Sequence, residues 1–155
     1  MKGNEKILAA LNNLLSDELT AISQYMVHSE MCDNWRYSKL HKHIEERAIT
    51  EMKHAEKLIA RILFLDGAPI VSSLKKISIG ADIQAQFAND LAAEYGAVKG
   101  YNEGIRLAYE LGDNGSRELM DSILTDEEDH VDWLEAQIEQ VKVMGLQSYL
   151  VEQVD

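Results

Sequence analysis

The sequence contains very little cysteine and proline, with one residue of each in a chain of 155. The single cysteine, Cys32, cannot form an internal disulfide, a cysteine-rich zinc site or a four-cysteine iron–sulfur site. One proline and 9 glycines leave few residues for the many turns that an all-β fold needs. These absences argue against disulfide-rich, zinc-finger, iron–sulfur and all-β proteins.

Basic residues are also scarce, because 15 Lys and Arg stand against 27 Asp and Glu, for a net charge of −12. This balance argues against binding to nucleic acid or to an anionic membrane surface. The sequence has no run of about 18 uncharged apolar residues that could span a membrane. It also has no targeting segment at its start. We expect a soluble, cytoplasmic protein of one domain, whose acidity indicates either solubility or cation binding.

Apolar residues recur every three or four positions in four long segments, which is the pattern of amphipathic helices. The predicted helices cover about residues 5–33, 38–65, 83–111 and 115–144, with a short fifth helix at about 147–153. Ser38 is the predicted N-cap of the second helix.

The connection at about residues 66–82 is much longer than the others. At about 3.3 Å per residue, it can run the full length of a helix of about 28 residues, which rises about 1.5 Å per residue. The second and third helices can therefore run parallel, whereas a simple up-down bundle would not need this loop. We predict one all-α domain over residues 1–155, a ferritin-like four-helix bundle with one long crossover.

Ionisable side chains interrupt the apolar stripe of every long helix. These residues are Glu18, Glu51, His54, Glu94, Glu127 and His130. Four carboxylates in one core are severely unfavourable unless a cation compensates them. Residues three apart share a helix face, so each of the two Glu-x-x-His motifs can bind one metal ion. Glu18 and Glu94 would then complete the two positions or bridge them.

The spacing of these residues supports a metal site. Glu18 precedes Glu51 by 33 residues, as Glu94 precedes Glu127, and a shift of 76 residues relates the two sets. Two matching hairpins would form a nearly symmetric two-metal site. The alternative is that these residues lie on the surface of helices whose phase is misjudged. Carboxylate-rich ligands favour iron or manganese over structural zinc, and open positions suggest Fe(II) oxidation by dioxygen or peroxide.

Two aromatic residues are expected close to this site. Tyr25 follows Glu18 by seven residues, and Trp133 follows His130 by three. Each could relay an electron to or from the metals, or simply belong to the apolar core.

Over essentially its whole length the sequence resembles the bacterioferritins. The residues that carry the resemblance are Met1–Gly3, Glu18, Gln24–Tyr25, Glu51–Ala55, Arg61–Leu65, Asp126–Glu135 and Met144–Leu150. The resemblance implies a shell of 24 subunits that oxidises Fe(II) with dioxygen or hydrogen peroxide and stores ferric mineral inside. It implies a di-iron centre formed by the six residues named above, and a ferredoxin-type reductant as a partner.

Met52 is the residue that the resemblance links to haem. At about 100° per residue, Met52 lies about 100° from Glu51 and about 160° from His54, so it points out of the bundle. An outward thioether beside Leu19, Ile22 and Met26 is also typical of an ordinary interface. The resemblance implies that Met52 from two subunits ligates a shared b-type haem. Covalent haem attachment is excluded because there is no Cys-x-x-Cys-His motif.

The chain departs from the family on the surface expected to face the cavity. Many bacterioferritins carry His and Asp where this chain has Glu46 and Thr50, which puts an accessory iron site in doubt and leaves Glu46 as a candidate inner-surface ligand. The segment Glu45–Arg47 also replaces an aromatic residue and a histidine. His28, His41 and His43 are interpreted as surface or packing residues.

Four other residues match positions that line a shell pore in the family. They are Asn34, Asp66, Asp132 and Glu139. An acidic pore would concentrate Fe(II). A solvated helix face is the alternative.

Two other functions compete with an iron-storing ferroxidase. One is a soluble di-metal oxidase or peroxidase without storage, although a rubrerythrin would need four cysteines for its second site. The other is a structural bundle without metal chemistry.

Overall fold

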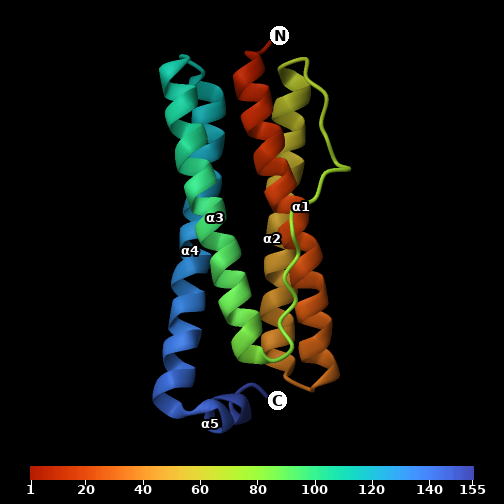
Figure 1. Ribbon diagram of the computed structural model, residues 1–155, viewed down its shortest axis with the longest axis vertical. Helices are drawn as coiled ribbons and strands as arrows, with labels where there is room; N and C mark the ends of the chain where they lie inside the picture. The colour runs from red at the N-terminus through yellow and green to blue at the C-terminus, as the bar shows by residue number, and fades with distance from the viewer.

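The computed structural model describes all 155 residues and consists of helices without strands, which confirms the predicted all-α class. The helices are α1 (Glu5–Asn34), α2 (Ser38–Phe64), α3 (Ile83–Glu110), α4 (Asn114–Met144) and α5 (Leu146–Val151). The four long helices form a bundle, and α5 lies across one end (Figure 1). None of the helices is long and apolar enough to cross a membrane.

The connection between α2 and α3 runs the length of the bundle. In Figure 1, α2 ends beside the N-terminus, and the chain then runs along α1 to the opposite end, where α3 begins. Consequently α2 and α3 are parallel, whereas α1 with α2 and α3 with α4 form antiparallel hairpins. This arrangement confirms the predicted ferritin-like bundle with a crossover between its second and third helices.

A polar stripe on α1 holds the crossover in place. Its side chains recur every fourth residue and so share one helix face: Asn12, Ser16, Thr20, Gln24 and His28. The hydroxyl of Thr20 accepts a hydrogen bond from the backbone N–H of Lys75 at 2.8 Å. Nε2 of His28 accepts one from the backbone N–H of Gly80 at 2.9 Å. These bonds satisfy backbone groups of a segment without secondary structure, and they make His28 a buried packing residue.

The start of α2 differs from the prediction. Ser38 is the first helical residue rather than the N-cap, and Tyr37 occupies the cap position without a side-chain capping bond. The reason is the tight turn after α1, where Arg36 adopts a φ of 67°. The backbone N–H of Tyr37 bonds back to the carbonyl of Cys32, so the helix begins as soon as the turn ends.

The apolar core is divided into two clusters. One contains Leu11, Leu58 and Met120, among others, and the second contains Ile44, Phe87 and Leu134. Along each helix, buried ionisable residues lie between the positions that belong to the two clusters. The polar centre of the bundle is therefore enclosed by apolar layers on both sides.

Candidate metal centre

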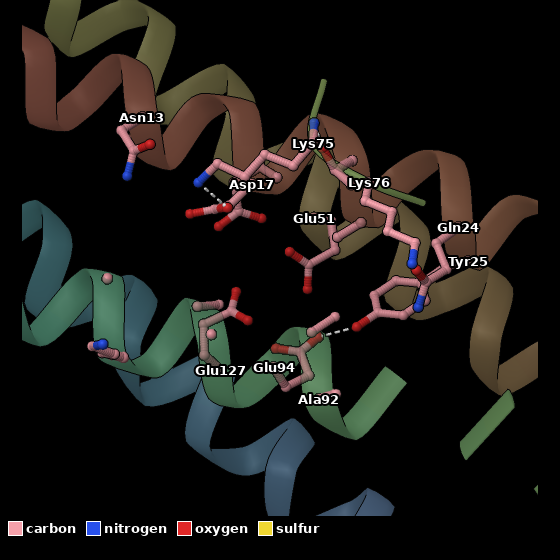
Figure 2. A pocket seen from close by; sticks show the side chains of 18 of the residues that line it. Asn13, Asp17, Gln24, Tyr25, Glu51, Lys75, Lys76, Ala92, Glu94 and Glu127 are labelled. Carbon is pink, nitrogen blue, oxygen red and sulfur yellow. Dashed lines mark hydrogen bonds and ion pairs between the residues drawn. The ribbon is translucent and has the colours of Figure 1, made fainter. Parts of the chain in front are cut away.

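The six predicted metal ligands lie together in this polar centre. Glu18 comes from α1, Glu51 and His54 from α2, Glu94 from α3, and Glu127 and His130 from α4. All are buried, and His130, the most exposed of them, retains 6% of its surface. Figure 2 shows the carboxylates of Glu51, Glu94 and Glu127 directed into one shared space.

The ligand atoms form two overlapping groups, each within 4.8 Å. The first position consists of Glu18, Glu51, His54 and Glu127, and the second of Glu51, Glu94 and His130. Two divalent cations with oxygen and imidazole ligands fit this arrangement. Since Glu51 belongs to both groups, it is the bridging candidate, whereas Glu18 and Glu94 each complete one position. The ligand groups thus favour completing roles over bridging roles for Glu18 and Glu94.

Two tyrosines orient the outer carboxylates. The hydroxyl of Tyr25 donates to Glu94, and that of Tyr101 donates to Glu18. Tyr101 is a functional candidate that was not predicted from the sequence. A signal was available, because Tyr101 follows Glu94 by seven residues, as Tyr25 follows Glu18.

Asp126 is a second residue that the sequence analysis did not assign. Its Oδ2 lies 2.9 Å from Nε2 of His54. This contact turns Nδ1 of His54 toward the carboxylates, 2.9 Å from Oε1 of Glu127. A carboxylate behind a histidine ligand fixes the orientation of the ring and strengthens it as a donor.

The four carboxylates do not share one protonation state in the absence of metal. Burial, followed by the charge of Glu51, raises the pKa of Glu18 well above its usual range. The pKa of Glu127 is raised in the same way. Burial alone would raise the pKa of Glu94, but its contact with Glu127 and its hydrogen bond with Nδ1 of His130 lower it to about 2. Metal binding must therefore displace protons from part of the ligand set.

His54 also holds a proton in the metal-free site. Burial alone would lower its pKa, but the carboxylates of Glu127, Glu18 and Glu51 around Nδ1 raise it to about 12. A protonated imidazole cannot ligate a metal ion, so binding at the first position requires loss of this proton.

Arg47 supplies a further positive charge, and the sequence analysis did not place it in the centre. Its Nη2 lies 2.6 Å from Oε1 of Glu51 and 3.2 Å from Oε2 of Glu127. These contacts lack the alignment of hydrogen bonds, so Nη2 and both carboxylate oxygens remain without hydrogen-bond partners. Buried oxygens of Glu18 and Glu94 are also without such partners. Carboxylate oxygens in this state are available as metal ligands, which supports the fit of cations to the site.

A cavity of about 380 Å³ reaches the centre from the face between α1 and α3. Glu18, Glu51, Glu94 and Glu127 line its inner part. Figure 2 shows Lys75 of the crossover reaching toward Asp17 of α1 in this cavity, where the two side chains form an ion pair. The cavity gives small molecules a route to the carboxylates.

The aromatic residues form a chain beside the second position. The ring centroids of Tyr25 and His130 are 5.5 Å apart, and those of His130 and Trp133 are 6.0 Å apart. His43 stacks on Trp133 at 3.7 Å, so it is a packing residue. Both Tyr25 and Trp133 are thus close enough to the centre for the redox role that their spacing suggested.

Met52 lies on the outer face of the bundle, with 41% of its surface exposed. It lines a depression of about 300 Å³ together with Ile22, Met26 and Ile49. An exposed thioether in an apolar depression fits an axial ligand for haem, and it also fits an apolar interface.

The four candidate pore residues do not form one cluster within the chain. Asn34 ends α1, whereas Asp66 follows α2 at the opposite end of the bundle (Figure 1). Asp132 and Glu139 lie on the half of α4 that leads to α5. All four are exposed, so any common pore would have to combine residues from different copies of the chain.

The comparisons with known proteins agree with this geometry. The sequence model described as the ferritin-like domain matches residues 8–144. The chain is 44% identical to a bacterioferritin of Rhodobacter capsulatus, over 96% of this chain and 92% of the relative. It is 40% identical to a bacterioferritin of Mycobacterium bovis, over 96% of this chain and 94% of the relative.

A solved structure is also very similar. The structure of Mycobacterium tuberculosis bacterioferritin, BfrA, matches with a TM-score of 0.98 and 39% identity. The match covers 100% of this chain and 98% of that one.

Proposed function

The chain belongs to the bacterioferritins, within the ferritin-like domain family, and on this premise we propose that it stores iron by oxidising Fe(II) at the buried centre. The observation that carries the proposal is the pair of overlapping ligand groups joined by Glu51. In a structural bundle without metal chemistry, such a buried set of carboxylates would lower the stability of the fold, because burying charges without a compensating cation costs free energy.

The substrate is Fe(II), and two ions bind per chain. Glu18, His54 and Glu127 hold one ion, Glu94 and His130 hold the other, and Glu51 lies between them. Two Fe(II) ions give two electrons to one dioxygen, which takes up two protons and leaves as hydrogen peroxide. When hydrogen peroxide is the oxidant, two electrons and two protons convert it to two waters. The Fe(III) ions then pass to the mineral.

The protein controls the protons that accompany this reaction. Glu18, Glu127 and His54 release protons when Fe(II) binds, because their pKa values are raised in the metal-free site. The phenol of Tyr25 keeps its proton, since burial and then the charge of Glu94 raise its pKa well above the usual range. Tyr25 therefore orients Glu94 as a donor in the resting centre and is placed to supply an electron.

A b-type haem is proposed at Met52. The thioethers of Met52 from two copies of the chain would hold the iron, and the apolar depression around Ile22, Met26 and Ile49 would receive the ring. Bound there, the haem would supply electron transfer between a ferredoxin-type reductant and the mineral. This role concerns the release of stored iron rather than its oxidation.

We further propose a shell of 24 copies around an iron cavity. In it, Asn34, Asp66, Asp132 and Glu139 would line pores, and Glu46 would face the cavity as a weak iron ligand. Glu46 is exposed and lies in a depression with His43, Thr50 and Asp129, which supports contact with iron outside the centre. A cytoplasmic location is part of the proposal and is compatible with the free, buried thiol of Cys32.

The test is iron-dependent oxygen consumption by the full-length, metal-free protein. Fe(II) is added without oxygen, dioxygen is then admitted, and Fe(III) absorbance is followed. We expect a fast phase that is lost when Glu94→Ala and Glu127→Ala are combined. The exposed pair Glu110→Ala and Glu118→Ala removes the same charge and should keep the fast phase. Oxidation by the first double variant at the wild-type rate would show that the site is assigned wrongly.

Storage is tested separately from oxidation. Light scattering should give the mass of a large shell, and iron added with dioxygen should remain soluble inside it. A protein that stays a monomer or dimer at all concentrations, yet oxidises Fe(II), would instead be a di-metal oxidase without storage.

A further inference from the structure

The guanidinium of Arg47 is the one buried cation in the centre that is not itself a candidate ligand. Only 10% of its side chain is exposed. Its Nη2 lies 2.6 Å from Glu51, 3.2 Å from Glu127 and 3.9 Å from Glu94. Nη2 thus lies among three carboxylates, at a place where a metal ion could bind.

The oxygen atoms that face Arg47 belong to one side of the centre. Arg47 faces Oε1 of Glu51 and Oε2 of Glu127. His54 faces the other oxygen of each carboxylate, Oε2 of Glu51 at 3.6 Å and Oε1 of Glu127 at 2.9 Å. The third oxygen near Arg47 belongs to Glu94, a member of the second position. The guanidinium therefore lies on the side of the centre that faces Glu94, at the second position. Glu18, and the oxygens of Glu51 and Glu127 that face His54, form no ion pair with an arginine or lysine.

We propose that Arg47 is a built-in cation that occupies the second metal position, so that the two positions fill in order and with unequal affinity. This inference rests on the proposed function. The first Fe(II) binds at Glu18, Glu51, His54 and Glu127 while the guanidinium stays in place. The second Fe(II) binds at Glu51, Glu94 and His130 only after the guanidinium leaves, since two cations cannot share these oxygens.

The structure offers a place for the displaced side chain. A depression of about 250 Å³ adjoins the centre, and Arg47 itself lines it beside His130. Two exposed carboxylates, Glu46 and Asp129, also line this depression and can receive the guanidinium. Withdrawal of Arg47 would therefore exchange buried ion pairs for solvated ones and open the centre toward that surface.

The test is an oxygen-free titration of the metal-free, full-length protein with Co(II), a redox-stable probe that is followed by absorbance and calorimetry. We expect one tight equivalent per chain and a second that binds on the order of tenfold more weakly, the usual size of such coupling. In Arg47→Leu, the two equivalents should bind with similar affinity. Arg106→Leu changes an exposed arginine of α3 that forms no ion pair, and it should behave as wild type.

Thermal melting separates this role from a purely structural one. Arg47→Leu should lower the melting temperature of the metal-free protein, because it leaves buried carboxylates without their cation. Saturating Co(II) should abolish that difference. A variant that melts equally early with and without Co(II) would show that Arg47 acts only in packing. If Arg47→Leu does not fold without metal, Arg47→Gln, which keeps a polar side chain but removes the charge, takes its place in the titration.

The outcomes also distinguish this inference from the proposed function. Two equal, tight equivalents in the wild type would overturn the role of Arg47 and leave the two-metal centre intact. Unequal binding that persists in Arg47→Leu would do the same. If neither protein binds Co(II) in the bundle, both the centre and the role of Arg47 are wrong.

Discussion

The hydroxyl of Tyr101 on α3 donates a hydrogen bond to Glu18 on α1, across the bundle. Tyr25 on α1 makes the corresponding bond to Glu94 on α3. Each hairpin thus supplies the tyrosine that orients a carboxylate of the other hairpin. These two bonds connect the halves of the centre before any metal arrives.

Removing either hydroxyl should destabilise the metal-free protein. In Tyr101→Phe, Oε1 of Glu18 loses its hydrogen-bond donor, which costs about 1–3 kcal/mol. In Tyr25→Phe, Oε1 of Glu94 loses one of two partners and keeps Nδ1 of His130, so the loss should be smaller. Denaturant unfolding in the presence of a chelator measures this loss. Tyr95→Phe is the matched control, because Tyr95 bonds to Glu135 at the surface, where water replaces the lost bond, and it should leave stability nearly unchanged. A loss in Tyr101→Phe no larger than in Tyr95→Phe would contradict the assigned contact.

The two tyrosines should differ in redox behaviour. Tyr25 contacts the ring of His130, which leads to Trp133, whereas Tyr101 has no aromatic neighbour of this kind. Reducing hydrogen peroxide to water takes two electrons, so a centre that holds one Fe(II) needs a second electron from the protein. We expect a transient tyrosyl radical by electron paramagnetic resonance in wild type and Tyr101→Phe. The same signal in Tyr25→Phe would exclude Tyr25 as its source.

The metal-free protein should lose stability as the pH rises above about 6. Folding raises the pKa of His54 to about 12 and also raises the pKa values of Glu18 and Glu127. The unfolded chain therefore releases these protons at a lower pH than the folded chain does. The loss has an upper limit of about 1.4 kcal/mol per pH unit for each group.

The opposite shifts of Glu51 and Glu94 do not cancel this trend. Their lowered pKa values stabilise the fold above the ordinary range of a glutamate, and this contribution is complete before neutral pH. Urea unfolding in chelator from about pH 6 to about pH 8, at one protein concentration, measures the slope. Glu18→Gln should flatten it. A rise in stability with pH over this range would refute the protonation pattern.

Haem binding should depend on Met52. Met52→Leu keeps the size and apolar character of the side chain but removes the sulfur ligand, so the Soret band should be lost after haem supplementation. Met26→Leu alters a neighbouring exposed methionine of the same depression and should keep the band. A wild-type protein without a Soret band under these conditions would rule out the haem site.

Much of the fold was predictable because the apolar positions repeat at helical spacing. The same repeat placed Glu18, Glu51 and Glu94 on buried faces, since they stand where the stripe requires an apolar residue. The length of the connection at about residues 66–82 then indicated a crossover along the bundle, with the second and third helices parallel. What the pattern did not predict is how the crossover is held, although the five polar residues of α1 at intervals of four were visible in the sequence.

The residues that surround the six candidate ligands were harder to predict from the sequence. Arg47 stands one helical turn before Glu51 and so shares its face, yet the sequence analysis treated it only as a departure from the family. An arginine on a helix surface is ordinary, and only the assembled bundle, in which Arg47 reaches Glu94 of α3 and Glu127 of α4, shows that its side chain turns inward. Similarly, side-chain rotamers decide which of the two carboxylate oxygens of Glu51 faces His54, and the spacing of residues in the sequence does not specify rotamers.

The most direct measurement of the central claim is anomalous diffraction at the iron absorption edge, from crystals soaked with Fe(II) in the absence of oxygen. We expect two peaks per chain in the middle of the bundle. One should lie beside Glu18 and His54, the other beside Glu94 and His130, with Glu51 between them. Crystals that contain iron but show no peak among these residues would contradict the two-metal centre.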